Sequence, residues 1–111
     1  MPAKRFTAEV YQGHSDCGVL VPFDPAAVWV DAVPRRIGYG KHEGYAVQGT
    51  VQGQAFESWI WFYFHEWRMV LPEDVLDAAG IGPGDRALIR ASPHPAPARV
   101  PPYRPGRKRT R

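Results

Sequence analysis

Hydrophobic and polar positions alternate along the first part of the chain. Phe6, Ala8 and Val10 are each separated by one polar residue within residues 5–12, and a period of two residues is typical of a strand with one buried face. The pattern therefore predicts a strand here, followed by a turn at residues 13–16. A short apolar run predicts a second strand over residues 18–23.

Prolines and glycines divide the rest of the chain into short elements. Pro25 and Pro34 delimit a predicted helical turn, and Pro72 and Gly80 delimit the clearest helix, over residues 72–79. Three glycines in residues 37–44 predict a loop. The remaining predicted strands cover residues 45–51, 59–67 and 86–91. Five or six short strands with one or two short helices predict a mostly β fold, a small barrel.

The aromatic run at residues 59–67 is the most informative segment. Successive side chains of a regular strand point to opposite faces, so the run divides into two sets. One set is ordinary core lining as far as Glu66. The other consists of large rings that carry polar atoms, the type enriched at interfaces and pockets: Trp59, Trp61, Tyr63, His65 and Trp67. This face predicts a surface that binds an apolar or aromatic small molecule or a protein partner.

His65 is the candidate general acid or base, because an imidazole titrates near neutral pH and this one shares the predicted face with four rings. Tyr63 and Glu66 are the candidate assisting groups. A hydrogen-bonded structural histidine is the alternative. In a regular strand Glu66 faces away from His65, so the two make a poor acid-base pair unless a bulge intervenes.

Metal-ligand residue types gather in one predicted turn, at His14, Asp16 and Cys17. Their spacing matches no zinc pattern, so the sequence predicts no metal and no other cofactor. Cys17 is the single cysteine, which excludes an internal disulfide and fits a reducing compartment. No apolar segment approaches the roughly 18 residues that span a bilayer, and no secretory signal is evident. These features predict a cytoplasmic protein without a membrane partner.

Charge divides the chain into a body and a tail. The formal net charge is +3, yet from Arg99 onward there are six basic residues and no acidic one. Six of the 12 prolines also lie between Pro93 and Pro105. We therefore predict a β-barrel domain over residues 1–91 and a disordered or extended tail over residues 92–111. The tail supplies candidate nucleic-acid contacts: Arg104, Arg107, Lys108, Arg109 and Arg111. A solubilising end without a fixed partner is the alternative.

Four segments occur in the order seen in a small bacterial family of unknown function. They are Phe6-Thr-Ala-Glu, Val21-Pro-Phe-Asp-Pro, Val47-Gln-Gly-Thr-Val-Gln-Gly-Gln-Ala-Phe56 and Leu71-Pro-Glu-Asp-Val-Leu-Asp-Ala-Ala-Gly-Ile-Gly-Pro-Gly-Asp85. On these residues the chain resembles DUF nineteen-oh-five, which is found next to or fused with YdeI/OmpD-associated domains. The last segment is also similar to the helix, turn and strand of AbrB/MazE-type swapped-hairpin proteins.

Both resemblances imply a split β-barrel, and the AbrB-like one implies an interlocked homodimer that binds DNA. The predicted helix departs from the AbrB pattern, because it carries Glu73, Asp74 and Asp77 and no basic residue. The leading hypothesis is therefore a non-catalytic binding module, homodimeric, that uses its aromatic face. The alternatives are a nucleic-acid-associated regulator that binds through the tail, and a small enzyme that uses His65.

Overall fold

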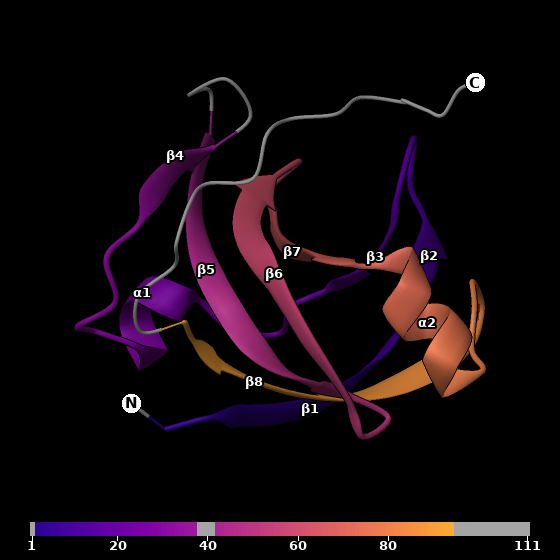
Figure 1. Cartoon of the computed structure of the whole chain (residues 1–111). Helices are drawn as coiled ribbons and strands as arrows, with labels where there is room; N and C mark the ends of the chain where they lie inside the picture. Colours follow the sequence, from indigo (N-terminus) through magenta and orange to yellow (C-terminus); the bar gives the residue numbers. More distant parts are fainter. Residues whose placement is uncertain (1, 38–41, 95–111) are drawn as a thin grey trace.

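The computed structural model describes residues 2–37 and 42–94. One antiparallel sheet curls into a half-barrel (Figure 1), with strands in the order β1-β8-β5-β6-β7-β3-β2 and β4 paired to β5. The strands are β1 (Lys4–Glu9), β2 (Tyr11–Gln12), β3 (Cys17–Leu20), β4 (Arg35–Ile37), β5 (His42–Val51), β6 (Gln54–Tyr63), β7 (Glu66–Leu71) and β8 (Arg86–Pro93), and the helices are α1 (Pro25–Val28) and α2 (Glu73–Ala79).

The mostly β prediction is confirmed, whereas the predicted strand count of five or six is too low. Eight strands lie in the described residues. The predicted strand over residues 5–12 is divided at Val10 into β1 and β2, and β4 has no strong pattern of its own. A third addition arises because the aromatic run, predicted as one strand, contains a turn between β6 and β7.

The two edges of the sheet are consecutive segments of the chain. β1 pairs with β8 and β2 pairs with β3, and only Val10 separates β1 from β2. The Val10 amide donates to the Asp85 carbonyl, and the Val10 carbonyl accepts from the Gly84 amide, both at 2.8 Å. Because its side chain is fully buried, Val10 fixes the bend by which one stretch of chain serves both edges.

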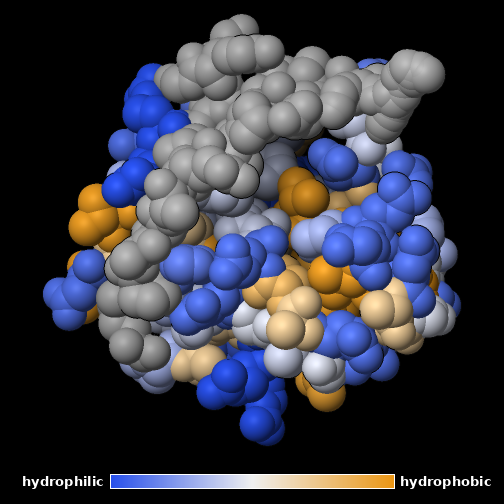
Figure 2. Space-filling view, viewed as in Figure 1, coloured by the Kyte–Doolittle hydropathy of each residue, from blue (hydrophilic) through white to orange (hydrophobic). Residues whose placement is uncertain are grey.

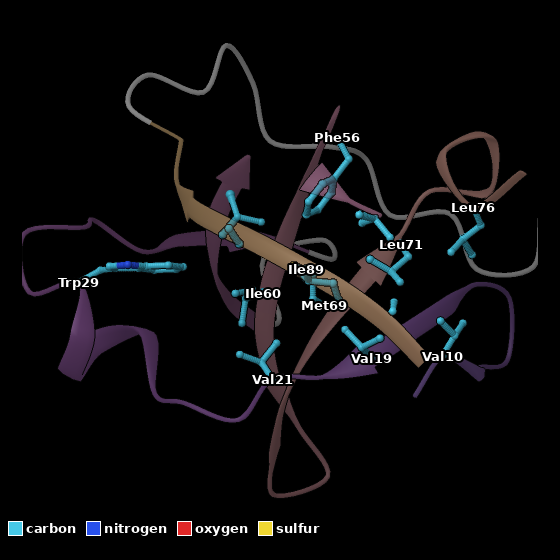
Figure 3. Close-up of a cluster of buried hydrophobic side chains, with 14 residues drawn as sticks. Val10, Val19, Val21, Trp29, Phe56, Ile60, Met69, Leu71, Leu76 and Ile89 are labelled. Atoms are coloured by element: carbon cyan, nitrogen blue, oxygen red, sulfur yellow. The ribbon is translucent and has the colours of Figure 1, made fainter. Parts of the chain in front are cut away.

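Alternation of side chains sends one face of the sheet into the core. Along β8, Ala87, Ile89 and Ala91 are buried, while the residues between them are exposed. Figure 3 shows the buried side chains running from Trp29 at one end to Val10 and Leu76 at the other. We call the opposite, solvent-facing side of the sheet the outer face.

The two helices lie at opposite ends of the half-barrel (Figure 1). α2 agrees with its prediction: Gly80 adopts a left-handed conformation (φ 74°), and its amide donates to the Asp77 carbonyl. α1 is a single turn capped by Asp24, whose carboxylate accepts from the Ala26 amide at 2.9 Å. The prediction of helix as far as residue 33 is wrong, because the chain leaves the helix at Trp29.

Two strands are longer than predicted. β5 begins at His42 instead of residue 45, so Gly44 lies inside a strand and not in the predicted loop. β8 continues beyond Ala91 to Pro93, and the His94 amide donates to the Ala46 carbonyl at 2.9 Å. Pairing with β5 therefore extends into the first residues of the predicted tail.

Candidate functional site

The aromatic run folds back on itself as a tight hairpin. β6 ends at Tyr63 and β7 begins at Glu66, with Phe64 and His65 as the two turn residues. Their φ angles are 51° and 63°, and positive φ at both central residues is the geometry of a type I′ turn. The prediction of one continuous strand over residues 59–67 is therefore wrong.

The hairpin redistributes the five predicted ligand-binding rings. Trp59, Trp61 and Tyr63 remain together on the outer face of β6. Trp67 is paired in register with Phe62 and so shares the core-side face, and His65 sits exposed in the turn. The predicted single surface of Trp59, Trp61, Tyr63, His65 and Trp67 does not form, because a two-residue turn reverses the chain within it.

A different set of rings comes together where β5, β6 and β7 meet the turn. On the core side, Trp67 lies 5.1 Å from Phe62 and 6.1 Å from Tyr45, measured between ring centroids. On the outer side, Tyr63 lies 5.6 Å from His42 and 4.5 Å from Phe64. We call this set the hairpin ring cluster: His42, Tyr45, Phe62, Tyr63, Phe64 and Trp67.

Three consecutive members of the hairpin ring cluster are open to solvent. Phe62, Tyr63 and Phe64 are 49%, 43% and 71% exposed. Tyr45, in contrast, is buried; this burial raises the pKa of its phenol, with smaller contributions from the negative charges of Asp24 and Glu43. Tyr45 is thus a neutral, buried ring that packs against Trp67.

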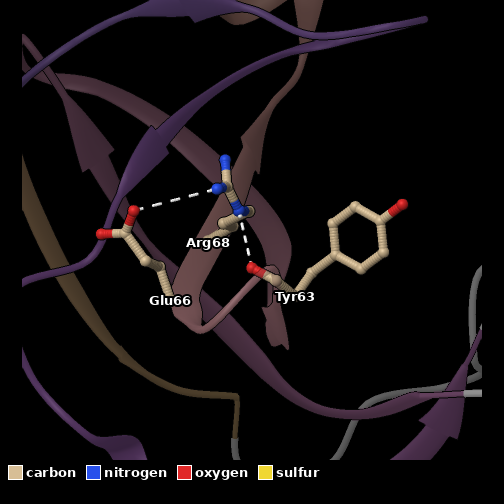
Figure 4. Close-up of polar contacts among 3 residues, drawn as sticks. All are labelled: Tyr63, Glu66 and Arg68. Carbon is tan, nitrogen blue, oxygen red and sulfur yellow. Dashed lines mark hydrogen bonds and ion pairs between the residues drawn. The ribbon is translucent and has the colours of Figure 1, made fainter.

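Two of the candidate acid-base residues, Tyr63 and Glu66, each contact Arg68. The Glu66 carboxylate lies 3.9 Å from the Arg68 guanidinium, and Arg68 Nε donates to the Tyr63 backbone carbonyl at 2.9 Å. Figure 4 shows the Tyr63 ring pointing away from both of these side chains. Arg68 thereby braces the hairpin, and Tyr63 and Glu66 do not converge on one reacting position.

The turn residues provide a test of the hairpin geometry. Replacing Phe64-His65 by Asn-Gly is expected to raise the free energy of unfolding by roughly 1 kcal/mol, because Asn and Gly adopt positive φ with less strain. Urea denaturation followed by circular dichroism measures the change. A loss of stability in this variant would contradict the assigned turn.

The turn at residues 13–16 holds no metal-ligand cluster. Within residues 2–37 and 42–94, no group of three His, Cys, Asp or Glu side chains is placed to hold a metal ion. Cys17 Sγ instead lies 3.6 Å from the Gln12 side-chain oxygen. Burial raises the pKa of the Cys17 thiol, and the carboxylates of Glu73 and Asp16 raise it further. A raised pKa keeps the thiol protonated and weakly nucleophilic.

The rings that sequence reasoning missed were His42, Tyr45, Phe62 and Phe64. His42 was assigned to a loop, and Phe62 and Phe64 were assigned to the core side of one strand. Phe64-His65 carries no Asn or Gly, so no turn signal is present within the aromatic run. The cross-strand contact between Phe62 and Trp67 follows only once the turn is known.

Comparison with known proteins identifies no family for this chain. No family profile matches its sequence, and no curated protein matches it. The resemblances to DUF nineteen-oh-five and to AbrB/MazE-type proteins therefore stay predictions, as do the homodimer and the cytoplasmic location.

Two further features bear on the predicted partners. No helix in the described part of the chain is long and apolar enough to cross a membrane. The predicted nucleic-acid contacts lie outside the described residues: Arg104, Arg107, Lys108, Arg109 and Arg111.

Proposed function

We propose that this protein is a non-catalytic binding module that holds an apolar or aromatic group against the hairpin ring cluster. The observation that carries the proposal is the exposure of Phe62, Tyr63 and Phe64 at the end of a braced hairpin. Three consecutive exposed rings leave apolar surface in water at the hairpin, with Phe62 and Tyr63 on opposite faces of β6, and exposed apolar surface marks sites of interaction with ligands or other proteins.

Backbone geometry at the turn supports the same proposal. Phe64 is the most exposed of these rings, and it occupies a left-handed conformation that a bulky residue adopts only at a cost in free energy. An Asn or Gly would satisfy this turn at lower cost. A large ring held there at that cost favours a role in contact over a role in stability.

Packing and hydrogen bonds restrict the motion of the hairpin ring cluster. Trp67 and Tyr45 support Phe62 from the core side, and the Tyr63 carbonyl is held by Arg68. Arg68 is itself held over the Tyr11 ring, 5.5 Å from its centroid. Rings that are already fixed lose little conformational entropy on binding, which favours affinity.

A neutral aromatic dye, N-phenyl-1-naphthylamine, provides a direct test. The Phe62→Ser/Phe64→Ser variant is expected to bind the dye at least about 10-fold more weakly than the unmodified chain, since each lost ring contact contributes about 0.5–1.5 kcal/mol. Dye fluorescence on titration gives the Kd.

Val30→Ser/Val33→Ser is the matched control. These valines are 75% and 77% exposed on the connection from α1 to β4, where hydrophobic groups appear at the left edge of Figure 2. This variant is expected to keep the dye affinity within about 2-fold, since it leaves the rings in place. Equal losses in the two variants would show that the dye reports general hydrophobicity, and the proposal would then fail.

A further inference from the structure

Three arginines share the outer face of β1 and β8. The register places Arg5 directly opposite Arg90, and Arg86 lies four residues before Arg90 on the same face of β8. All three are exposed. The strongly hydrophilic groups at the lower rim of Figure 2 lie where β1 and β8 run in Figure 1. Directly opposed residues of antiparallel strands have Cβ atoms about 5 Å apart, so the Arg5 and Arg90 charges are close neighbours.

These arginines are not neutralised within the described residues. The ion pairs there join Arg68 to Glu66 and His94 to Glu57, and neither involves the outer face of β1. Arg86 stands opposite Glu9 in the register, yet its guanidinium donates to Thr7 Oγ1 at 3.0 Å. It therefore reaches back along β1 toward Arg5. Opposed like charges destabilise a sheet, so this arrangement favours an anionic partner.

Arg90 also lines an open groove of about 660 Å³, and Pro72, Asp74 and Val75 at the start of α2 line it as well. Three polar side chains beside Arg90 can donate hydrogen bonds to phosphate oxygens: Gln48, Thr50 and Ser92. The groove also contains Glu57 and Asp74. Glu57 is exposed and lies 3.2 Å from His94, which offsets its charge only when the imidazole is protonated, and Asp74 belongs to α2. The Arg90 side of the groove is accordingly the side that suits an anion.

We propose that Arg5, Arg86 and Arg90 bind the phosphate backbone of a single-stranded nucleic acid. Arginine is the side chain best suited to phosphate, because its planar guanidinium donates two parallel hydrogen bonds. The contact needs a partner with several phosphates in sequence, since the arginines extend roughly 13 Å along β8. It belongs to the folded body and is independent of the basic tail.

The choice of a single strand rests on the proposed function, since Tyr63 of the hairpin ring cluster lies on the same outer face as the three arginines. Thr50 of β5 is paired with Arg90 of β8 on one side and with Ala55 of β6 on the other. From Ala55 the outer face of β6 continues through Glu57, Trp59 and Trp61 to Tyr63, over roughly 26 Å at 3.3 Å per residue. Unpaired bases can stack on such rings, whereas the bases of a duplex are already stacked.

Fluorescence anisotropy of a labelled oligothymidylate of about 20 nucleotides, longer than the usual site of a small barrel, tests the proposal with the full chain. Arg5→Gln/Arg90→Gln is expected to weaken binding at least about 10-fold at roughly 50 mM salt. It is also expected to reduce the slope of log K against log salt by about 1.4, or 0.7 for each lost phosphate contact. Its melting temperature is expected to hold or rise, because an opposed like-charge pair is removed.

Single substitutions supply a charge-matched comparison. Arg90→Gln is expected to weaken binding about 5-fold, and Arg36→Gln less than about 2-fold, although each removes one exposed arginine and both keep the basic tail. Arg36 lies on β4 opposite Glu43, away from β8. Equal losses from Arg90→Gln and Arg36→Gln, or no binding by the unmodified chain, overturn the proposal. So does a duplex of the same length that binds as tightly as the single strand.

An abasic oligonucleotide of the same length separates this proposal from the proposed function. Weaker binding of the abasic strand, with the arginine effects retained, supports both base stacking and the backbone contact. Equal binding of abasic and thymidine strands, with the arginine effects retained, keeps the backbone contact and counts against the rings as the base-binding surface. Loss of the arginine effects with either strand overturns the backbone contact itself.

Discussion

Gly49→Ala is expected to lower the free energy of unfolding by about 3 kcal/mol or more. A Cβ atom at this position would overlap the carbonyl oxygen of Arg90 and lie 2.9 Å from the Cα atom of Ala91. Both are backbone atoms of β8, so no side-chain rotation can relieve the overlap. β5 and β8 would have to separate in the middle of their pairing, which runs from Val47 to Val51.

Urea denaturation followed by circular dichroism gives the change in free energy, and Gly82→Ala provides the control. Gly82 lies between α2 and β8, where a Cβ atom meets nothing within 4 Å. The control is expected to change stability by less than about 1 kcal/mol, toward greater stability, because alanine restricts the unfolded chain. Similar losses in both variants would contradict the close approach of β5 and β8.

The second large effect is expected at Trp29, which is fully buried at one end of the core (Figure 3). Its ring packs edge-on against Phe23 at 5.2 Å, and Phe23 packs in turn against Phe6 at 5.8 Å. The indole Nε1 donates to the Pro2 carbonyl at 2.9 Å. Trp29→Ala removes this whole assembly and is expected to cost about 3–5 kcal/mol.

Two milder variants show which part of Trp29 matters. Trp29→Phe keeps most of the packing and loses the hydrogen bond to Pro2, so it is expected to cost roughly 1–2 kcal/mol. Val30→Ala changes the adjacent, exposed residue and is expected to shift stability by less than about 0.5 kcal/mol. Thermal and urea denaturation measure all three. A cost for Trp29→Ala below that of Trp29→Phe would contradict the packing at this end of the core.

Local signals predicted the parts of the fold that depend on local chemistry. Alternation at Phe6 and Ala8 predicted β1, and Pro72 with Gly80 predicted α2 almost to the residue. Both patterns depend only on neighbouring residues, so they predict these elements without any information on the tertiary structure. The role of Trp29 depends instead on Phe6, Phe23 and Pro2, which come together only in the folded barrel.

The candidate site was predicted in composition but not in arrangement. The composition of the aromatic run makes it a candidate contact surface, but strand periodicity does not continue through Phe64 and His65. These two residues adopt positive φ although neither is an Asn or a Gly, the residue types that favour this conformation. A two-residue error of this kind moves Trp67 to the other face and replaces it with new neighbours, His42 and Phe64, around Tyr63.

The shared origin of the two sheet edges has a consequence for how the chain folds. β1 is made first, but its partner β8 comes almost at the end of the described chain; Thr7 and Arg86, which are hydrogen-bonded, stand 79 positions apart. Closing so long a loop costs conformational entropy before the contacts between the two strands can stabilise the chain. During synthesis we therefore expect β1 to pair with β8 only after nearly all of the described chain has been made.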